Sequence, residues 1–392
     1  MLVTEINGVK EKCTGCFACA NACPKKAINL PLDSEGFYFP VIDKNQCVNC
    51  GRCEAVCQIN HKKEKESMGK MYSFMAEDAV RMKSSSGGAF YHLAQCVLVN
   101  DGVVYGAAYD SMQKKVVHTS TSYVSLEDLM RSKYVQSDVG DSYRQAEADL
   151  KSEKQVMFVG TPCQIHGLKN YLNKDYNNLV TVDFVCHGVP SPGFLSDVIG
   201  YYERKEQASV TNVTFREKDP GWRDQVTKLY FDTGKVIKEK SSYYYYYYYL
   251  FLHNCTLRKS CYTCMNPENH IADITVMDYW QIKGDDNKGV SVIKLNTQKG
   301  AALFDFMEGN FQINVIDNPA SLSSAFIRHC QIKGYTRAIK DREYFFDYYK
   351  KNGFEKTLNS WYPCYYRKSI FMGKIYTTGG KFKSKLKRML GR

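Results

Sequence analysis

Apolar and polar residues alternate in short runs through most of the chain after residue 70. Residues 71–78 alternate with the period of two that is typical of a strand, whereas residues 89–99 carry apolar side chains at helical spacing. Further apolar runs of strand length occupy residues 102–109, 156–159, 179–185, 272–280 and 289–296. Strands that alternate with helical segments predict an α/β domain, in which we expect the 156–159 and 179–185 strands to be parallel.

A polar segment separates this domain from a smaller N-terminal one. Residues 58–70 (QINHKKEKESMGK) are charged and offer almost nothing to bury, so we expect a linker over residues 61–70. The N-terminal domain then spans residues 1–60 and the α/β domain residues 71–335. A basic, tyrosine-rich C-terminal extension completes the chain over residues 336–392.

Eight of the 16 cysteines repeat one spacing in the N-terminal domain. Each run follows C-x2-C-x2-C-x3-C: Cys13, Cys16, Cys19 and Cys23, then Cys47, Cys50, Cys53 and Cys57. This resembles the bacterial two-cluster ferredoxin module, in which the fourth cysteine of each run ligates the other run's 4Fe-4S cluster. We therefore expect Cys57 to complete the first cluster and Cys23 the second. A hairpin-like stretch between the runs is expected to pack over them.

Structural zinc and disulfides are the alternatives for these cysteines. Zinc sites usually pair C-x2-C knuckles rather than repeat this longer spacing. Disulfides would require an exported chain. Pro24 follows the first run, whereas Gln58 follows the second, a departure from the ferredoxin pattern that removes no ligand.

Other candidate residues lie where predicted strands end or helices begin. The turn at residues 84–88 (SSSGG) precedes a helix, where hydroxyls, free N–H groups and the helix dipole suit a phosphate; an ordinary serine N-cap is the alternative. Cys163 begins a helix whose dipole favours the thiolate, and Cys186 follows a strand. Ligand sites of α/β sheets lie at such strand ends. Cys261 and Cys264 form a C-x2-C pair that suits a metal.

Composition narrows the class of protein. At 392 residues, 44% of them hydrophobic, the chain has room for two or three domains with real cores. We see neither a signal peptide nor an apolar run of membrane-spanning length, so we expect a cytoplasmic protein with reduced or metal-bound cysteines. The formal net charge of +12 suits acidic redox partners and phosphate-bearing cofactors. No nucleic-acid-binding motif accompanies this charge, so we expect no nucleic acid partner.

Two regions of unusual composition remain. Residues 243–249 are seven consecutive tyrosines, for which we expect a packed aromatic surface. Residues 381–390 (KFKSKLKRML) form a short basic amphipathic segment. It is either a solvated tail or a peripheral contact to a membrane surface or an acidic partner.

Four stretches together resemble the beta subunit family of coenzyme F420 hydrogenases and dehydrogenases. They are SSSGGAF, SKYVQSD, VGTPCQIHGLK with VDFVCHGVPSP, and LRKSCYTC with ADITVMDYW, within roughly residues 1–300. The resemblance implies an α+β protein: a small two-cluster ferredoxin-like module followed by an α/β flavin-binding domain. It implies that FAD lies against Ser85, Ser86, Gly87, Gly88, Lys133, Tyr134 and Gln136. It also implies a third 4Fe-4S cluster on Cys163, Cys186, Cys261 and Cys264.

Cysteines outside these sets are expected to play smaller parts. Cys255 could replace one ligand of the third cluster, while Cys96, Cys330 and Cys364 are expected to be buried fillers. No catalytic residue follows from the sequence.

The function implied is an oxidoreductase in which FAD relays electrons between one-electron carriers of the ferredoxin type and a two-electron substrate or hydride carrier. A ferredoxin or a hydrogenase- or dehydrogenase-type subunit would be its redox partner. Two alternatives stay open. One is a specialised reductase of a biosynthetic pathway, for example of surface polysaccharide. The other is an iron–sulfur electron carrier with no substrate of its own.

Overall fold

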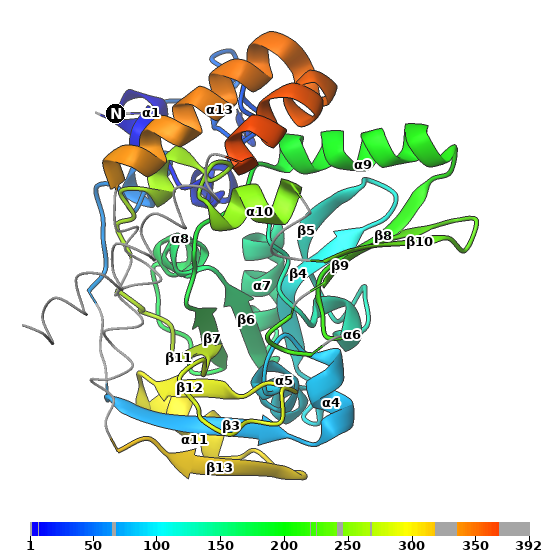
Figure 1. Cartoon of the computed structure of the whole chain (residues 1–392). Coiled ribbons are helices and arrows are strands. Elements are labelled where there is room, and N and C mark those ends of the chain that lie inside the picture. Colours follow the sequence, from blue (N-terminus) through cyan, green and yellow to red (C-terminus); the bar gives the residue numbers. More distant parts are fainter. Residues whose placement is uncertain are drawn as a thin grey trace, which may run out of the picture. The chain divides into compact units, whose positions relative to one another are not determined.

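The computed structural model (Figure 1) describes most of the chain. The described residues are 2–6, 8–64, 68–219, 221–224, 226–240, 246–266, 269–317 and 335–367. They form two compact units, Met1–Arg342 and Glu343–Arg392, of which the first holds both the N-terminal cysteines and the large sheet. No helix within the described parts is long and apolar enough to cross a membrane.

The N-terminal domain is built from short elements around its cysteines. They are η1 (Val3–Glu5), α1 (Val9–Lys12), α2 (Ala18–Ala22), β1 (Ile28–Asn29), β2 (Val41–Ile42) and α3 (Arg52–Ala55). The predicted hairpin is confirmed, because β1 and β2 pair antiparallel with Ile28 opposite Ile42. A small apolar cluster that includes Val3, Ile6 and Val9 packs around Cys19 and Cys53. Short elements suffice here because the cysteine loops, rather than long strands, occupy most of the domain.

An eight-stranded mixed sheet forms the centre of the α/β domain, in the order β13-β3-β12-β11-β7-β6-β4-β5. Its strands are β3 (Lys70–Ala76), β4 (Val103–Asp110), β5 (Lys115–Ser120), β6 (Val156–Gly160), β7 (Leu179–Phe184), β11 (Ile274–Asp278), β12 (Ser291–Leu295) and β13 (Phe311–Val315). The four central strands β4, β6, β7 and β11 run parallel, which confirms the prediction for the 156–159 and 179–185 strands. The outer strands pair antiparallel.

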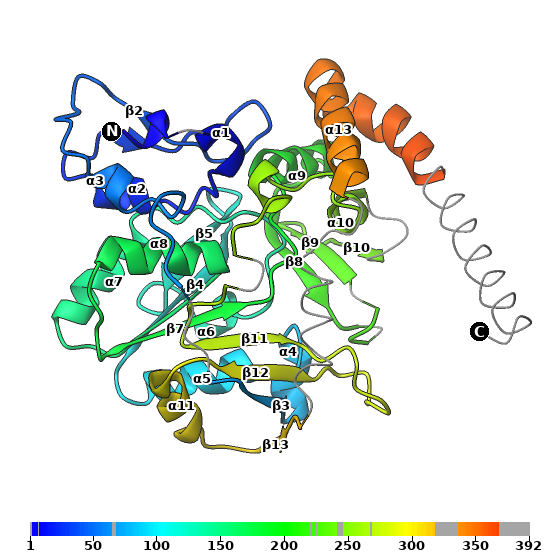
Figure 2. The same ribbon diagram turned by 90° about the vertical axis from the view of Figure 1, so that its left-hand side faces the viewer.

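Helices cover both faces of this sheet. Successive side chains of a strand therefore enter two different hydrophobic cores. Met157 of β6 packs with α5 (Ala89–Leu98) and α11 (Gln298–Asp305), whereas its neighbour Phe158 packs with α7 (Ser142–Lys151) and α8 (Pro162–Leu172). Phe17 and Ala18 of the N-terminal domain belong to the second core. Figure 2 shows the N-terminal domain beside α7 and α8, so this domain docks on that face of the sheet.

The first unit also contains helices outside these layers and a smaller antiparallel sheet. They are α4 (Asp78–Lys83), α6 (Leu126–Leu129), α9 (Pro192–Glu206), the antiparallel sheet of β8 (Val210–Glu217), β9 (Val226–Phe231) and β10 (Val236–Lys240), α10 (Tyr246–Leu252) and η2 (Lys259–Cys261). Four tyrosines of the run, Tyr246–Tyr249, are buried in α10. They form packed aromatic surface, as predicted, while Tyr243–Tyr245 lie outside the described residues.

Two expectations at the ends of domains need correction. Gln58, at the start of the polar segment, is only 3% exposed and hydrogen-bonds across the domain border, so it belongs to the packed structure. Cys364 is exposed rather than buried, whereas Cys96 is buried as expected. Cys330 and the basic segment 381–390 lie outside the described residues.

The helix α13 (Tyr335–Lys356) crosses from the first unit into the second and is followed by η3 (Thr357–Trp361). A kink at Gly353, where φ is 75°, separates two helical parts of α13. Within the second unit Phe345 packs edge-on against Trp361, with ring centroids 5.4 Å apart. Aromatic side chains therefore form the core of this unit.

Candidate functional site

The eight N-terminal cysteines surround two small cavities. One, of about 30 Å³, is lined by Cys13, Cys16, Cys19 and Cys57, which we call the Cys13 site. The other, of about 20 Å³, is lined by Cys23, Cys47, Cys50 and Cys53, which we call the Cys47 site. The fold thus brings each fourth cysteine to the other run, in the grouping that the spacing predicts. Ligation of clusters by these residues stays a prediction.

A third group of thiols lies where the sequence places it, at the ends of β6 and β7. Cys163 is the second residue of α8, Cys186 follows β7, and Cys261 ends η2. Burial, and after it the charges of Cys261, Cys163 and Cys264, raise the pKa of Cys186 well above its usual value. These four thiols, the Cys163 site, therefore lie within electrostatic reach of one another. Cys255 instead directs its Sγ to the carbonyl of His253, 3.6 Å away.

The ionisation of Cys163 differs from the sequence expectation. Burial, and after it the sulfurs of Cys264, Cys16 and Cys261, raise the pKa of this thiol to about 12, although the Thr161 hydroxyl lies 3.1 Å from Sγ. The dipole of α8 acts in the other direction but is outweighed by loss of hydration. The protein alone therefore does not hold a thiolate here. A bound cation would reverse this balance.

None of the described residues forms a group of three or more His, Cys, Asp or Glu side chains that could hold a single metal ion. Zinc needs its ligand atoms around one point, whereas a four-iron cluster places each thiolate on a separate iron corner. Cysteines that surround a cavity fit the second arrangement.

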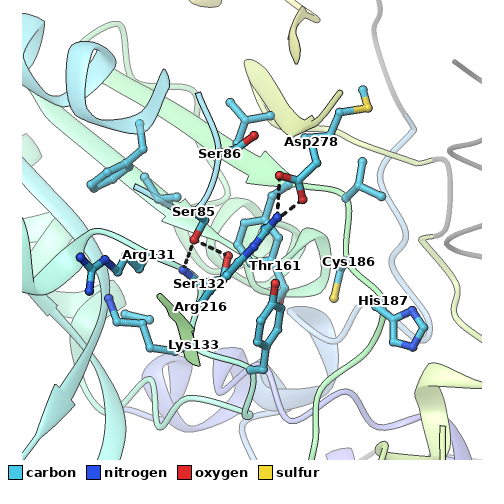
Figure 3. Close-up of a pocket in the computed structure, with 18 of the residues that line it drawn as sticks. Ser85, Ser86, Arg131, Ser132, Lys133, Thr161, Cys186, His187, Arg216 and Asp278 are labelled. Carbon is cyan, nitrogen blue, oxygen red and sulfur yellow. Dashed lines mark hydrogen bonds and ion pairs between the residues drawn. The ribbon is translucent and has the colours of Figure 1, made fainter. Parts of the chain in front are cut away.

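A cavity of about 510 Å³ opens at the carboxyl ends of the parallel strands. Its wall comes from the residue 84–88 turn, the loop after α6, the ends of β6, β7 and β11, and the helix α10. Figure 3 shows Arg131 and Lys133 on one side of it and Cys186 and His187 on the other. Such a strand-end position is where α/β sheets bind their ligands, and the volume is within the usual range for small-molecule sites.

Five of the seven residues predicted to hold the flavin line this cavity: Ser85, Ser86, Gly88, Lys133 and Tyr134. Gly87 does not. A Cβ at this position would lie 2.2 Å from the carbonyl oxygen of Phe74, so its glycine permits the close approach of the turn to β3.

Gln136 also lies away from the cavity, at the border with the N-terminal domain. Its Nε2 donates to the carbonyls of Thr14 and Gly15, 3.1 and 3.2 Å away. The buried Arg258 donates to the carbonyl of Cys13 at 2.7 Å and to Gln136 Oε1 at 3.1 Å. Gln136 therefore helps to hold the first cysteine loop rather than the cavity wall.

The serine turn is held from both sides. The backbone N–H of Ser132 donates to Ser85 Oγ at 2.7 Å, and Ser86 Oγ donates to the carbonyl of Val290 at 2.7 Å. The buried Lys218 donates to the carbonyls of Ser86, Arg81 and Lys288 at 2.6–2.7 Å. The turn is thus rigid at the N-terminus of α5, where a phosphate would be favoured.

One ion pair in the cavity wall has no counterpart among the sequence predictions. Arg216 of β8 forms a bidentate pair with Asp278 of β11, with both N···O distances 2.9 Å (Figure 3). Its guanidinium lies 5.3 Å from the ring centre of Trp280, which stacks on Trp222. The only sequence signals were an Arg in the Phe215–Arg216 dipeptide and an acid in a predicted strand. Neither indicates a contact across 62 positions.

His118 lies in the same wall and is neutral. Its Nδ1 is 2.9 Å from Ser137 Oγ, and its Nε2 is 3.0 Å from the carbonyl oxygen of Val159, which requires the proton on Nε2. Burial lowers its pKa to about 4. Ser137 Oγ also accepts from Gln164 Nε2 at 2.9 Å, so the imidazole is part of the support of the wall.

We expect this histidine to make the fold acid-sensitive. Because the unfolded imidazole binds a proton near pH 6.5 and the folded one only near pH 4, the free energy of unfolding should fall as pH drops between these values. From pH 7.5 to 5.5 the loss is roughly 1–2 kcal/mol. Urea unfolding at both pH values should show a smaller loss for His118→Gln. His61→Gln, with an imidazole 51% exposed, is the control and should keep the wild-type dependence. An equal loss in His118→Gln would contradict the assignment.

Comparison with known proteins gives the chain two family matches. Residues 153–319 match the C-terminal part of the beta subunit of the coenzyme F420 hydrogenase/dehydrogenase family, and residues 12–60 match the 4Fe-4S dicluster domain. An uncharacterized ferredoxin of Methanocaldococcus jannaschii is 36% identical over 59 residues, which are 15% of this chain and 75% of that protein. A chain from the structure of the F420-reducing NiFe hydrogenase complex of Methanosarcina barkeri is 16% identical, with a TM-score of 0.45. That alignment covers 72% of this chain and 94% of the other.

Proposed function

Because the chain belongs to the coenzyme F420 hydrogenase/dehydrogenase beta subunit family and carries an N-terminal 4Fe-4S dicluster domain, we propose that it is an iron–sulfur flavoprotein. An iron–sulfur electron-transfer oxidoreductase is the class that follows from the two family matches. Within that class, FAD would relay electrons between a one-electron carrier and a two-electron substrate.

The observation that carries the proposal is the position of Cys186. This residue lines the large cavity and also belongs to the Cys163 site. A cluster on those four thiols would therefore border whatever the cavity binds. Electron transfer between two centres is fastest when little protein separates them, and here a single cysteine forms the border.

The cavity fits a flavin nucleotide in size and in the chemistry of its wall. The N-terminus of α5 would hold a phosphate. Lys133 lies in the same wall; burial lowers its pKa to about 7, and a bound phosphate would favour its charged form. Val159, Val182 and Phe251 supply apolar wall for a ring system. When bound, FAD supplies the exchange between hydride and single electrons.

The wall residues also define how a substrate is received. The ion pair between Arg216 and Asp278 fixes the spacing between β8 and β11. The stacked rings of Trp222 and Trp280 fill the space beside this pair. His118 and Ser137 keep the end of β6 in place without adding charge. These residues would orient the substrate and exclude water from the cavity. The thiol sites would provide the path for electrons.

The alternatives differ in what they need from this cavity. A pure electron carrier would have no use for a 510 Å³ cavity beside its thiols. A specialised biosynthetic reductase would use the same cofactors and differ in its substrate. A separate redox protein, of the ferredoxin type or a subunit of a larger complex, is the partner that we propose in either case. Membrane contact through residues 381–390 stays a prediction.

The test is anaerobic purification followed by rapid reduction. Three four-iron clusters predict roughly twelve irons per chain, with releasable FAD and no zinc. A deazaflavin, NADH, NADPH and reduced ferredoxin are then mixed with the protein in turn, and flavin and cluster absorbance are followed separately. Reduction of both chromophores by one of these donors is expected. Absence of bound flavin, or a flavin that no donor reduces while the clusters respond, would contradict the relay.

A further inference from the structure

The Cys13 site packs directly against the helix that carries Cys163. A Cβ at Gly167 of α8 would lie 3.0 Å from Cys16 Sγ, so the glycine makes room for this sulfur. Cys163 is the second residue of the same helix. The Cys13 site and the Cys163 site are therefore neighbours.

The Cys47 site has different surroundings. Cys50 is exposed, and the adjacent Val48 is 56% exposed. These residues lie on the loop between β2 and α3, whereas α2, at the Cys13 site, packs on α7 and α8. Of the two N-terminal sites, the Cys47 site is thus the one that an outside redox protein can approach; in the Cys163 site, Cys264 is the exposed member.

A single side chain spans the border between the Cys13 and Cys163 sites. Nε2 of the buried Gln58 donates to Thr14 Oγ1 at 3.1 Å and to the carbonyl of Cys163 at 2.9 Å. Its Oε1 accepts from Asn266 Nδ2 at 2.8 Å. The backbone N–H of Asn266 donates to Cys264 Sγ at 3.4 Å.

Gln58 also holds the loop that carries two sulfurs of the Cys13 site. Its bond to Thr14 fixes the residue that lies between Cys13 and Cys16 in the chain. Hydrogen bonds to sulfur are among the factors that set the potential of an iron–sulfur cluster. Gln58, the residue that departs from the ferredoxin pattern, is therefore placed to influence both the position and the potential of a cluster at the Cys13 site.

We propose that Gln58 is a positioning residue that couples the Cys13 cluster to the Cys163 cluster, in an ordered path from the Cys47 site inward. This rests on the proposed function, because it requires centres at all three cysteine sites. The cysteines of the three sites would hold the clusters. An external one-electron donor would supply one electron at the Cys47 site, and that electron would pass through the Cys13 site to the Cys163 site. Each site that gives an electron would be oxidised and each that receives it reduced, with no bond formed or broken and no proton moved.

Three variants of the anaerobically purified holoprotein test the coupling. Gln58→Leu removes all three side-chain bonds. Gln58→Glu keeps the acceptor for Asn266 but removes the donors to Thr14 and Cys163. Gln46→Leu is the matched control, since Gln46 lies beside the Cys47 site and its side chain donates to Asp43 at 2.9 Å, on the exposed side of the domain. Dithionite is the electron donor, and the readouts are EPR redox titration of each cluster and freeze-quench reduction of the Cys163 cluster.

Gln58→Leu and Gln58→Glu should shift the potential of the Cys13 cluster and slow reduction of the Cys163 cluster on the order of tenfold, the scale on which outer-shell partners of metal ligands act. The Cys47 cluster should keep its potential in both, and Gln46→Leu should keep the wild-type rate. If Gln58→Leu does not assemble its clusters, Asn266→Leu breaks the bridge from the other side and should show the same slowing.

Unchanged rate and unchanged Cys13 potential in the Gln58 variants would overturn the inference. Failure of the proposed function has a different signature, namely wild-type protein without flavin or with iron for two clusters only. In that case the redox potential of the Cys13 cluster still reports the effect of Gln58 on that cluster. The two failures are therefore distinguishable.

Discussion

Cys186→Ser is expected to lower the iron content by about four per chain and to stop reduction of the flavin by one-electron donors. A serine hydroxyl is a poor ligand for iron, and Cys186 lies within electrostatic reach of Cys163, Cys261 and Cys264 as one of the four thiols of the site. Iron analysis and EPR should show the two N-terminal clusters unchanged. Stopped-flow mixing with reduced ferredoxin should show those clusters respond while flavin absorbance stays constant.

Cys255→Ser is the matched control for this experiment. Cys255 is fully buried, but its sulfur points to the carbonyl of His253, and a serine hydroxyl can make the same contact. This variant should keep its iron and its flavin reduction. If instead Cys186→Ser keeps full iron and activity, the four thiols of the Cys163 site are structural or redox-active cysteines. The proposed relay would then have no cluster between the N-terminal clusters and the flavin.

Arg216→Met is expected to destabilise the fold by about 3 kcal/mol, because it leaves Asp278 charged in the wall of the cavity without its partner. The Arg216 side chain is 4% exposed and that of Asp278 is 20% exposed, so water replaces little of the lost bidentate contact. The uncompensated carboxylate should also repel an anionic cofactor and reduce flavin occupancy. Urea unfolding and the flavin-to-protein ratio measure the two effects.

Lys83→Met provides the comparison, since Lys83 also forms an ion pair, with Glu127, but both side chains are exposed, by 58% and 64%. Such surface pairs contribute only about 0–1 kcal/mol. The double variant Arg216→Met with Asp278→Leu should recover most of the lost stability, because no buried charge remains unpaired. Equal losses in Arg216→Met and Lys83→Met would show that burial of the Arg216 pair does not raise its contribution to stability.

Local patterns predicted much of the scaffold. Strands such as β6 and β7 are short apolar runs, and their parallel pairing follows from the helix between them. Cys163 and Cys186 could be placed at one sheet edge for the same reason. The spacing of the N-terminal cysteines likewise predicted their grouping around two cavities, since a tight loop can supply only three corners of a cluster.

Single residues were harder to place when their role depends on distant partners. Gln136 lies in a stretch that otherwise lines the cavity, yet its amide reaches the loop at Thr14, 122 positions away. Gly87 was expected to contact the flavin, but its lack of a Cβ serves the packing on β3. Cys364 is exposed because the second unit forms its core from aromatic rings instead.

The sequence by itself determined the chemistry of this protein: the number and spacing of its thiols, and the strands and turns that carry them. Those features depend on neighbours in the chain, where the period of a strand or the reach of a loop sets the geometry. Only the tertiary structure decided that Gln58 connects two cysteine sites and that Arg216 meets Asp278. Each of these contacts joins segments far apart in the chain, and its energy depends on burial that no local pattern encodes.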